Sequence, residues 1–197
     1  MDKQDIEILD QKTNYKGYFS IVTLQYRHKL FAGGWSDVVE KEVFERGNSV
    51  GVLLYDPIAD RIAMIEQCRA GAVPHPENPW LVEIVAGECE PDETNQQVAI
   101  REAKEEAGVD ITELVPICNY FVSPGGSTEK MELFCARVDS HQMGGIYGLQ
   151  DEHEDIKVIV VACDEAFEQV RTGAINTGPA IIALQWLQLN KHNLWQE

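Results

Sequence analysis

Three glutamates stand close together between Ala99 and Ala107, and their spacing suits metal-ion chemistry. This stretch contains no Gly or Pro and is rich in Ala, Glu, Lys and Arg, so it is predicted to be helical. Residues three and four apart share one face of a helix, which places Glu102, Glu105 and Glu106 within an arc of roughly 100°. Carboxylates gathered in this way repel one another unless a cation lies between them, and Mg²⁺ commonly joins carboxylates to substrate phosphates.

The residues around these glutamates decide between a site and an ordinary solvated helix, which can have a similar composition. From Gly87 to Val109 the chain reads G-E-C-E-P-D-E-T-N-Q-Q-V-A-I-R-E-A-K-E-E-A-G-V. Seven of these residues fit the pattern G-x5-E-x7-R-E-(apolar)-x-E-E-x-G-(apolar): Gly87, Glu93, Arg101, Glu102, Glu105, Glu106 and Gly108. A chance match to these seven positions is expected in about one chain in a million of this length. The sequence therefore resembles the Nudix hydrolases, which cleave a diphosphate joined to another group.

The same window predicts how the helix is held. Gly108 is expected to end it, because glycine takes the left-handed C-terminal conformation without strain. Val98 and Ile100 are expected to face the core. Arg101 can pair with Glu93 or Glu105 and so fix the helix against the loop that precedes it.

Length and composition bound the class of protein. The 197 residues make one domain, or one domain with an N-terminal extension, and 44% hydrophobic residues suffice for a core. No apolar run is long enough to span a membrane, and the N-terminus lacks the apolar core of a signal peptide. The five cysteines are odd in number and widely spread, as expected for reduced, mostly buried thiols of a cytoplasmic protein.

The formal net charge of -17 argues against a nucleic-acid partner, because phosphate neutralisation needs clustered Lys and Arg. A small diphosphate substrate is also anionic, and metal ions would have to bridge it to such a surface. The acidity therefore agrees with metal dependence. No Ser-His-Asp or Cys-His grouping indicates a covalent nucleophile.

Alternation and turn residues predict a mixed sheet flanked by helices. An Asp164–Arg171 helix with Asp164 as its cap is predicted, followed by a C-terminal helix that opens at Gly178-Pro179 and buries Ile181, Leu184, Leu187 and Trp186. Strands are predicted at 22–30, 38–46, 50–55, 61–68, 80–85, 117–122, 131–138 and 156–161, with a proline-rich loop at 71–79.

The predicted fold class is therefore α+β, as in the Nudix fold, a mixed sheet sandwiched between helices. Residues 1–48 form an N-terminal antiparallel β extension, and residues 49–197 form the Nudix hydrolase domain. The extension is expected either to be a small sheet of its own or to form the interface of a homodimer.

Features outside the window are similar to the bacterial ADP-ribose pyrophosphatase subgroup. A proline follows the window at the distance typical of that subgroup, within Ser123–Glu129. The acidic loop Gly148–Asp155 is also similar to theirs, and a Pro-Gly-Gly turn or a solvated loop is the structural alternative at these two places. Further similarity lies at 44–47, 66–69 and 183–189, so the resemblance runs from about Tyr18 to the C-terminus.

The resemblance implies roles for particular carboxylates. Mg²⁺, or Mn²⁺ in its place, would be held by the Ala86 backbone carbonyl and by Glu102, Glu106 and Glu154. Glu105 would assist, through water or a bridging position. The resemblance also implies that Glu152, on the acidic loop, is the general base for the attacking water, and that Arg101 completes the catalytic set.

The resemblance also implies how a nucleoside diphosphate sugar is bound. Arg46 and Arg69 would contact phosphates or the terminal ribose, where a planar guanidinium suits paired oxygens. Tyr18 and Phe19 would stack on adenine across a dimer, although they could equally be strand core. Glu88 and Glu129 would line the ribose side of the substrate. Ser123, Pro124 and Gly125 would line the same side from the partner subunit.

The activity implied is Mg²⁺-dependent hydrolysis of ADP-ribose to AMP and ribose 5-phosphate. One alternative substrate is another nucleoside diphosphate sugar such as GDP-mannose. A second alternative is a Nudix domain that only senses nucleotides. Such sensors usually lose carboxylates of the window, and this chain retains all of them.

Overall fold

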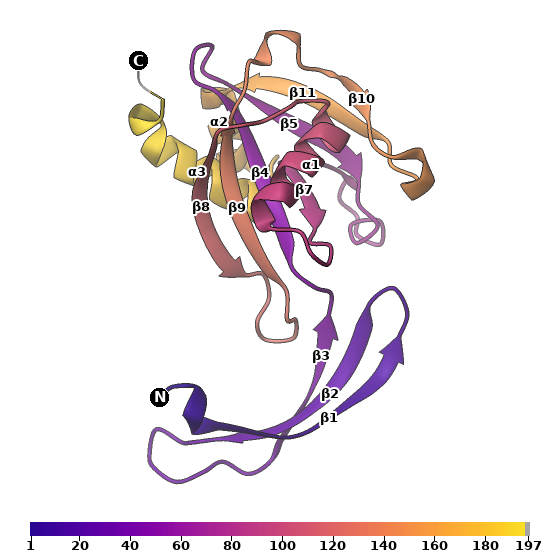
Figure 1. Ribbon diagram of the computed structural model, residues 1–197, viewed down its shortest axis with the longest axis vertical. Coiled ribbons are helices and arrows are strands. Elements are labelled where there is room, and N and C mark those ends of the chain that lie inside the picture. The colour runs from indigo at the N-terminus through magenta and orange to yellow at the C-terminus, as the bar shows by residue number, and fades with distance from the viewer. Residues whose placement is uncertain (196–197) are drawn as a thin grey trace. The chain divides into compact units, whose positions relative to one another are not determined.

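The computed structural model describes residues 1–195, which divide into two compact units (Figure 1). The first unit comprises Met1–Asn48 and Phe121–Lys130, and the second comprises Ser49–Tyr120 and Met131–Glu197. Residues 196 and 197 lie outside the described part. No helix within residues 1–195 is both long enough and apolar enough to cross a bilayer.

The first unit is built on a three-stranded antiparallel sheet in the order β1-β2-β3. Its elements are η1 (Lys3–Asp5), β1 (Ile6–Lys16), β2 (Ser20–His28) and β3 (Val39–Glu45). Every residue of β1 is exposed, and Val22 is the one buried apolar side chain of this unit. The sequence did not predict β1, because a strand exposed on both faces carries no two-residue hydrophobic alternation.

The segment from Phe121 to Lys130 belongs to the first unit through backbone pairing with β3. The Phe44 N–H donates to the Gly126 carbonyl at 2.8 Å, and the Thr128 N–H donates to the Phe44 carbonyl at 3.1 Å. Residues 1–48 therefore do not make up this unit alone.

The second unit contains a mixed eight-stranded sheet. Its main path runs β10-β11-β5-β4-β9-β8, with β6 paired to β5 and β7 paired to β4. The β4–β9 pair is parallel, and β4 pairs antiparallel with β5 and β7. The strands are β4 (Ser49–Asp56), β5 (Arg61–Cys68), β6 (Trp80–Glu83), β7 (Val85–Glu88), β8 (Leu114–Phe121), β9 (Lys130–Arg137), β10 (Gly145–Tyr147) and β11 (Ile156–Ala162).

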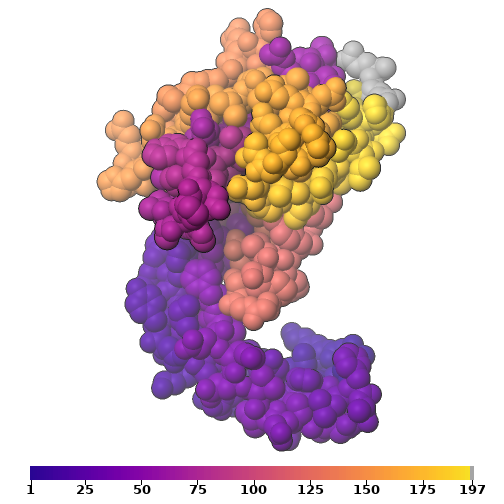
Figure 2. Space-filling model, turned by 180° about the vertical axis from the view of Figure 1, so that it is seen from behind, coloured from indigo at the N-terminus to yellow at the C-terminus, as the bar shows by residue number. Residues whose placement is uncertain are grey.

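Helices cover both faces of this sheet. One core cluster packs α1 against it through Val98, Ala99 and Ala103, and the other packs α2 and α3 through residues such as Ala166 and Leu184. Figure 1 shows α1 in front of the sheet, and Figure 2 shows the yellow C-terminal helix on the opposite face. The predicted mixed sheet between helices is confirmed. The helical elements are α1 (Asn95–Ala107), η2 (Ser140–Gln142), η3 (Gln150–Glu152), α2 (Cys163–Thr172), α3 (Gly178–Asn190) and η4 (Lys191–Asn193).

Several local predictions were wrong. Ile100 is 43% exposed, whereas Val98 is buried as expected. Asp164 does not cap α2, which begins one residue earlier at Cys163 with Ala162 in the cap position. The single strand expected at 80–85 is two short strands with a break at Ile84, because β6 pairs with β5 while β7 turns to pair with β4.

The cysteines and the C-terminal helix follow the sequence more closely. All five cysteines are free thiols, but only Cys135 and Cys163 are fully buried. Leu184 and Leu187 are buried in α3, as expected. Ile181, also expected in this buried stripe, is only half-buried.

Candidate active site

The helix α1 is fixed at both ends by local hydrogen bonds. Thr94 and Gln97 form a capping box, in which the Thr94 N–H donates to Gln97 Oε1 at 2.8 Å and the Gln97 N–H donates to Thr94 Oγ1 at 3.3 Å. The cap explains why the helix starts at Asn95 and not at Ala99. Gly108 ends it with φ +68, the left-handed conformation expected there.

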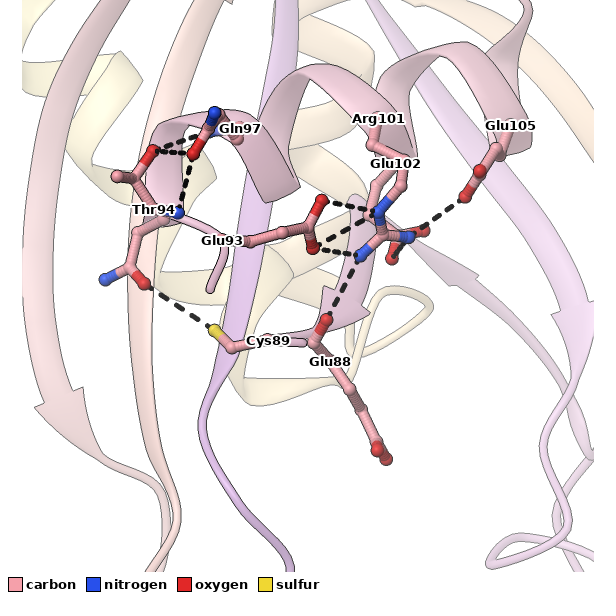
Figure 3. Close-up of polar contacts among 9 residues, drawn as sticks. Glu88, Cys89, Glu93, Thr94, Gln97, Arg101, Glu102 and Glu105 are labelled. Carbon is pink, nitrogen blue, oxygen red and sulfur yellow. Dashed lines mark hydrogen bonds and ion pairs between the residues drawn. The ribbon is translucent and has the colours of Figure 1, made fainter. Parts of the chain in front are cut away.

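Arg101 gathers the acidic groups of the window around one guanidinium (Figure 3). Its Nε and Nη2 donate to the Glu93 carboxylate at 3.1 and 3.0 Å. Its Nη1 donates to Glu102 Oε1 at 2.7 Å and to Glu105 Oε2 at 3.0 Å. Nη2 also donates to the Glu88 carbonyl at 3.3 Å, which ties α1 to the end of β7. Both pairings expected for Arg101 are present, and this ion-pair network lowers the pKa of Glu93.

Two carboxylates of α1 are buried against β7. Glu106 is 3% exposed, and its Oε2 accepts a hydrogen bond from the Ala86 N–H at 2.9 Å. Glu102 is 9% exposed and lies against Gly87, where a β-carbon would meet Glu102 Oε1 at 1.6 Å. The glycine that opens the window is therefore needed because the carboxylate fills the space of its side chain.

Burial strongly perturbs these two groups. Desolvation raises the pKa of Glu106 to about 8; the Ala86 N–H opposes this shift, while the nearby charges of Glu102 and Glu154 add to it. Desolvation likewise raises the pKa of Glu102 to about 7, against the opposing effect of Arg101. Glu102 and Glu106 thus form a buried acidic pair with little water to screen it.

The carboxylate oxygens of Glu102 and Glu106 suit a hard divalent cation, although these side chains are not arranged around one in this structure. Among residues 1–195, no three Asp, Glu, His or Cys side chains are positioned to enclose a metal ion. Arg101 engages Glu102, and the Ala86 N–H engages Glu106. A cation would offset the desolvation and the like-charge repulsion that raise both pKa values, and carboxylate oxygens are the ligands that Mg²⁺ prefers. The chemistry fits, and binding requires side-chain rotation.

The acidic loop that follows β10 brings two more carboxylates to this helix. The Gly148 N–H donates to the Glu105 carbonyl at 3.3 Å. Glu154 closes the loop, because its Oε2 accepts from the Leu149 N–H at 3.1 Å and its own N–H donates to the Leu149 carbonyl at 3.1 Å. Burial and the charges of Glu154, Asp151 and Glu105 raise the pKa of Glu152.

Arg69 lies on the same acidic surface, and its partner was not predicted. Its Nε donates to Glu83 Oε2 at 2.6 Å, and its charge lowers the pKa of Glu106. Glu83 was missed because the two residues are fourteen positions apart on different elements. The available signal was that Glu83 is the one charged residue in the otherwise apolar run 80–85.

The remaining candidates lie in the first unit. Arg46 Nη1 donates to Glu129 Oε1 at 2.5 Å, and the Arg46 guanidinium lies 5.8 Å from the Phe19 ring centroid. Phe19 stacks edge-on with Tyr18 at 4.8 Å and with Phe44 at 5.0 Å. Tyr18 is 86% exposed, so it is not strand core. Ser123, Pro124 and Gly125 form a tight turn, closed by the Gly126 and Ser127 N–H groups, which donate to the Ser123 carbonyl at 3.1 and 2.9 Å.

The fold, the seven-position window and the carboxylates around α1 together define a Nudix domain. The NUDIX domain family matches residues 45–192, and this chain belongs to the Nudix family. It is 46% identical over 197 residues to an ADP-ribose pyrophosphatase of Haemophilus influenzae, covering 98% of this chain and 91% of that one.

Two further similarities place this relationship in context. A GDP-mannose pyrophosphatase of Shigella flexneri serotype 5b is 31% identical over 191 residues, covering 95% of this chain and 97% of that one. A crystal structure of an ADP compounds hydrolase superimposes with a TM-score of 0.69 at 18% identity, covering 96% of this chain and 98% of that one. At that identity the structural similarity bears on the fold alone.

Proposed function

We propose that this chain hydrolyses the diphosphate of ADP-ribose to AMP and ribose 5-phosphate in a reaction that depends on Mg²⁺. The observation that carries the proposal is the pair of buried carboxylates, Glu102 and Glu106, held against Ala86 and Gly87 with raised pKa values. Burying two carboxylates is costly, and the Arg101 ion pair reaches Glu102 but not Glu106, so a bound cation would stabilise the ionised pair. The name of the Haemophilus influenzae relative supports the choice of ADP-ribose.

The residues proposed to hold the metal are the Ala86 carbonyl, Glu102, Glu106 and Glu154, with Glu105 assisting. Mn²⁺ is expected to substitute for Mg²⁺, because both suit oxygen ligands. The chemistry that such an ion supplies is neutralisation of the diphosphate charge and a lowered pKa of bound water.

The protein's own groups complete the reaction. Glu152 takes the proton of the attacking water, whose oxygen bonds to one phosphorus as the bridging P–O bond breaks and the other phosphate departs. The Arg69 guanidinium, held at Nε by Glu83, offers its two terminal nitrogens to phosphate oxygens. Arg101 sets the orientation of Glu105 through the ion pair at 3.0 Å.

Substrate binding is proposed to use first-unit residues as well. Arg46 and Glu129 form a preorganised polar pair, and Tyr18 and Phe19 form an aromatic pair of the kind that stacks on a base. The roles of Glu88 and of the Ser123–Gly125 turn on the ribose side belong to the same proposal.

We further propose a homodimer in the cytoplasm. The support for a dimer is β1, an edge strand whose apolar side chains are exposed without a covering element in the described chain, such as Ile8 at 65% and Tyr15 at 62%. Natural edge strands of this length are usually paired or covered. The free thiols agree with a reducing compartment.

The test is a substrate panel with product identification. The purified protein is incubated with ADP-ribose, GDP-mannose and dinucleotides, with Mg²⁺ or with EDTA. AMP and ribose 5-phosphate formed from ADP-ribose only with Mg²⁺ support the proposal. Faster turnover of GDP-mannose would reassign the sugar, and binding without turnover of any substrate would indicate a sensor.

The matched variants are Glu102→Gln and Glu106→Gln, which keep side-chain size and remove the charge. Each is expected to lower kcat by about 100-fold or more, because a lost metal ligand removes charge stabilisation in the transition state. A near wild-type rate in either variant would remove that residue from the ligand set.

A further inference from the structure

Tyr147, the last residue of β10, packs closely against Gly108, the residue that ends the signature helix. A β-carbon placed on Gly108 would come within 2.3 Å of Tyr147 Cε1, 2.7 Å of Cζ and 2.8 Å of the hydroxyl oxygen. The Tyr147 ring is half-buried and packs against the core cluster beneath α1. Gly108 therefore serves two purposes. It takes the left-handed conformation that ends α1, and it leaves room for this ring.

The residue after Tyr147 makes a second attachment at the same place. The Gly148 N–H donates to the Glu105 carbonyl, which lies in the last turn of α1 and lacks a partner within the helix. Gly148 has φ +104, and a β-carbon on it would meet the Glu154 Cβ at 2.6 Å. The loop is thus attached to the C-terminal end of α1 through two adjacent residues, Tyr147 and Gly148, and folds tightly back on itself.

The attachment matters because of what the loop carries. Between Leu149 and Glu154 the chain makes two closing hydrogen bonds, and Glu152 lies inside this small ring. The charges of Glu154 and Glu105 both act on the pKa of Glu152, so the loop carboxylates lie near the acidic face of α1. A loop that supplies a proton acceptor must be placed to within about 1 Å for efficient catalysis.

We propose that Tyr147 is a positioning residue, whose ring seats the 148–154 loop on the C-terminal end of α1. The effect of this positioning on catalysis rests on the proposed function, in which Glu152 and Glu154 act from this loop. The ring carries this role. No hydrogen bond of the Tyr147 hydroxyl is recorded among the described residues, and the contact with Gly108 spans the ring edge.

The first test measures the loop without any substrate. Backbone amide exchange is followed in the full chain for the wild type, Tyr147→Ala and Tyr147→Phe. In Tyr147→Ala, amides of 148–154 are expected to exchange at least about tenfold faster, because local opening no longer breaks the ring contact. Amides of β4 and of the α1 interior keep wild-type rates, and Tyr147→Phe keeps slow loop exchange. Unchanged loop exchange in Tyr147→Ala would overturn the proposal.

The matched control is Phe167→Ala. Phe167 is also a half-buried aromatic residue, but it packs in the other core cluster, on the α2 and α3 face of the sheet. Its loss removes similar packing without touching the loop. If Phe167→Ala speeds loop exchange as much as Tyr147→Ala does, the effect is general destabilisation and the proposal fails.

The second test uses kinetics and separates positioning from folding. With ADP-ribose and saturating Mg²⁺, Tyr147→Ala is expected to lower kcat by about 10- to 100-fold and to change KM by less than about threefold, because the base is displaced while substrate contacts remain. Tyr147→Phe restores most of kcat. A pure rise in KM would contradict the inference.

A double variant checks the steric contact directly. Gly108→Ala alone pushes a methyl group into the Tyr147 ring and also strains the backbone at φ +68. In the Tyr147→Ala background only the backbone strain remains, so the additional loss of kcat is smaller there. Equal losses in both backgrounds would refute the contact. If the wild type does not act on ADP-ribose, the proposed function fails, and the exchange measurements still decide the role of Tyr147.

Discussion

The backbone of Gly87 and the carboxylate of Glu102 occupy contiguous space, with a distance of only 1.6 Å between Oε1 and the position of a Gly87 β-carbon. Gly87→Ala must therefore displace Glu102 from its place beside β7. We expect kcat to fall by about 100-fold, because a shift of about 1 Å in a reacting group has that effect. Overpacking is expected to lower the free energy of unfolding by roughly 1–3 kcal/mol.

Gly178→Ala is the control for this substitution. Gly178 is the first residue of α3, and a β-carbon there meets nothing within 4 Å apart from its chain neighbours and the backbone of its own helix. It is expected to leave kcat unchanged, because Gly178 lies outside the carboxylate site around α1. Steady-state kinetics and urea unfolding of both variants measure the difference. Wild-type activity in Gly87→Ala would show that Glu102 can act from elsewhere.

The raised pKa values of Glu102 and Glu106 predict how metal-free stability depends on pH. The ordinary value is 4.5, and burial raises these pKa values to about 7 and about 8 in the folded state. Between these limits the folded state binds more protons than the unfolded state, so the free energy of unfolding falls as pH rises from about 5 to about 8. The loss is expected to be on the order of 1–3 kcal/mol.

Urea unfolding in EDTA at a series of pH values measures this slope. Glu106→Gln is expected to flatten it, and saturating Mg²⁺ is expected to cancel it in the wild type, since a bound cation favours the ionised carboxylates. Stability that rises with pH over the same range in EDTA would contradict the assignment.

Local spacing predicted the parts of the site that lie on one element. Residues 101–106 share a helix, and the chain from Glu93 leads directly into it, so the ion pairs of Arg101 could be predicted without knowledge of the fold. Gly108 was predictable for the same reason, because its C-cap role depends on α1 alone.

Contacts made between distant elements could not be predicted in this way. The Glu83 partner of Arg69 depends on the break at Ile84, where one apolar run serves two strands. The contact between Tyr147 and Gly108 depends on how β10 pairs with β11. The strand β1 was missed because its residues are exposed on both faces and so carry no two-residue hydrophobic alternation.

The ion pair between Arg69 and Glu83 predicts a defect in substrate binding. With Nε held at 2.6 Å by Glu83, the guanidinium presents its other two nitrogens as a fixed pair. Glu83→Gln weakens that restraint, so KM for ADP-ribose is expected to rise by about three- to tenfold, with a smaller change in kcat. Arg69→Lys, which loses the fork geometry, is expected to raise KM more. An unchanged KM in both variants would show that Arg69 and Glu83 have no part in substrate binding.

Asp56 provides a prediction about folding that is independent of catalysis. Its carboxylate accepts from the N–H groups of Ile58 and Ala59 at 2.9 and 3.0 Å, and from the N–H and hydroxyl of Ser140 at 2.9 and 2.7 Å. Burial alone would raise the pKa of Asp56, but these hydrogen bonds outweigh it and lower the pKa. The stability that they confer is present above about pH 4 and is lost as pH falls.

Asp56→Ala is expected to lower the free energy of unfolding at neutral pH by roughly 2–4 kcal/mol, because several donors lose their acceptor. Asp56→Asn keeps one acceptor oxygen and should lose less. Asp56 ends β4 at the opposite end from Ser49, whose partner in β7 is Glu88, so kcat of the folded variants is expected to match the wild type. Urea unfolding and activity per folded molecule measure the two effects separately.

The role of Glu152 can be separated from metal binding by one substitution. Glu152→Gln keeps the shape of the 148–154 loop, whose closing bonds use Leu149 and Glu154, but removes the proton acceptor. Turnover is expected to fall by about 100- to 10,000-fold, the usual contribution of a general base, while the Mg²⁺ concentration for half-maximal activity changes little. Asp151→Asn, one residue away on the same η3 turn, removes a similar exposed charge and should retain most of kcat. If the two substitutions lower kcat equally, the loop contributes through its overall charge and Glu152 is not the base. The proton acceptor must then be one of the carboxylates of α1. Glu105 is the first candidate, because its side chain is less buried than those of Glu102 and Glu106.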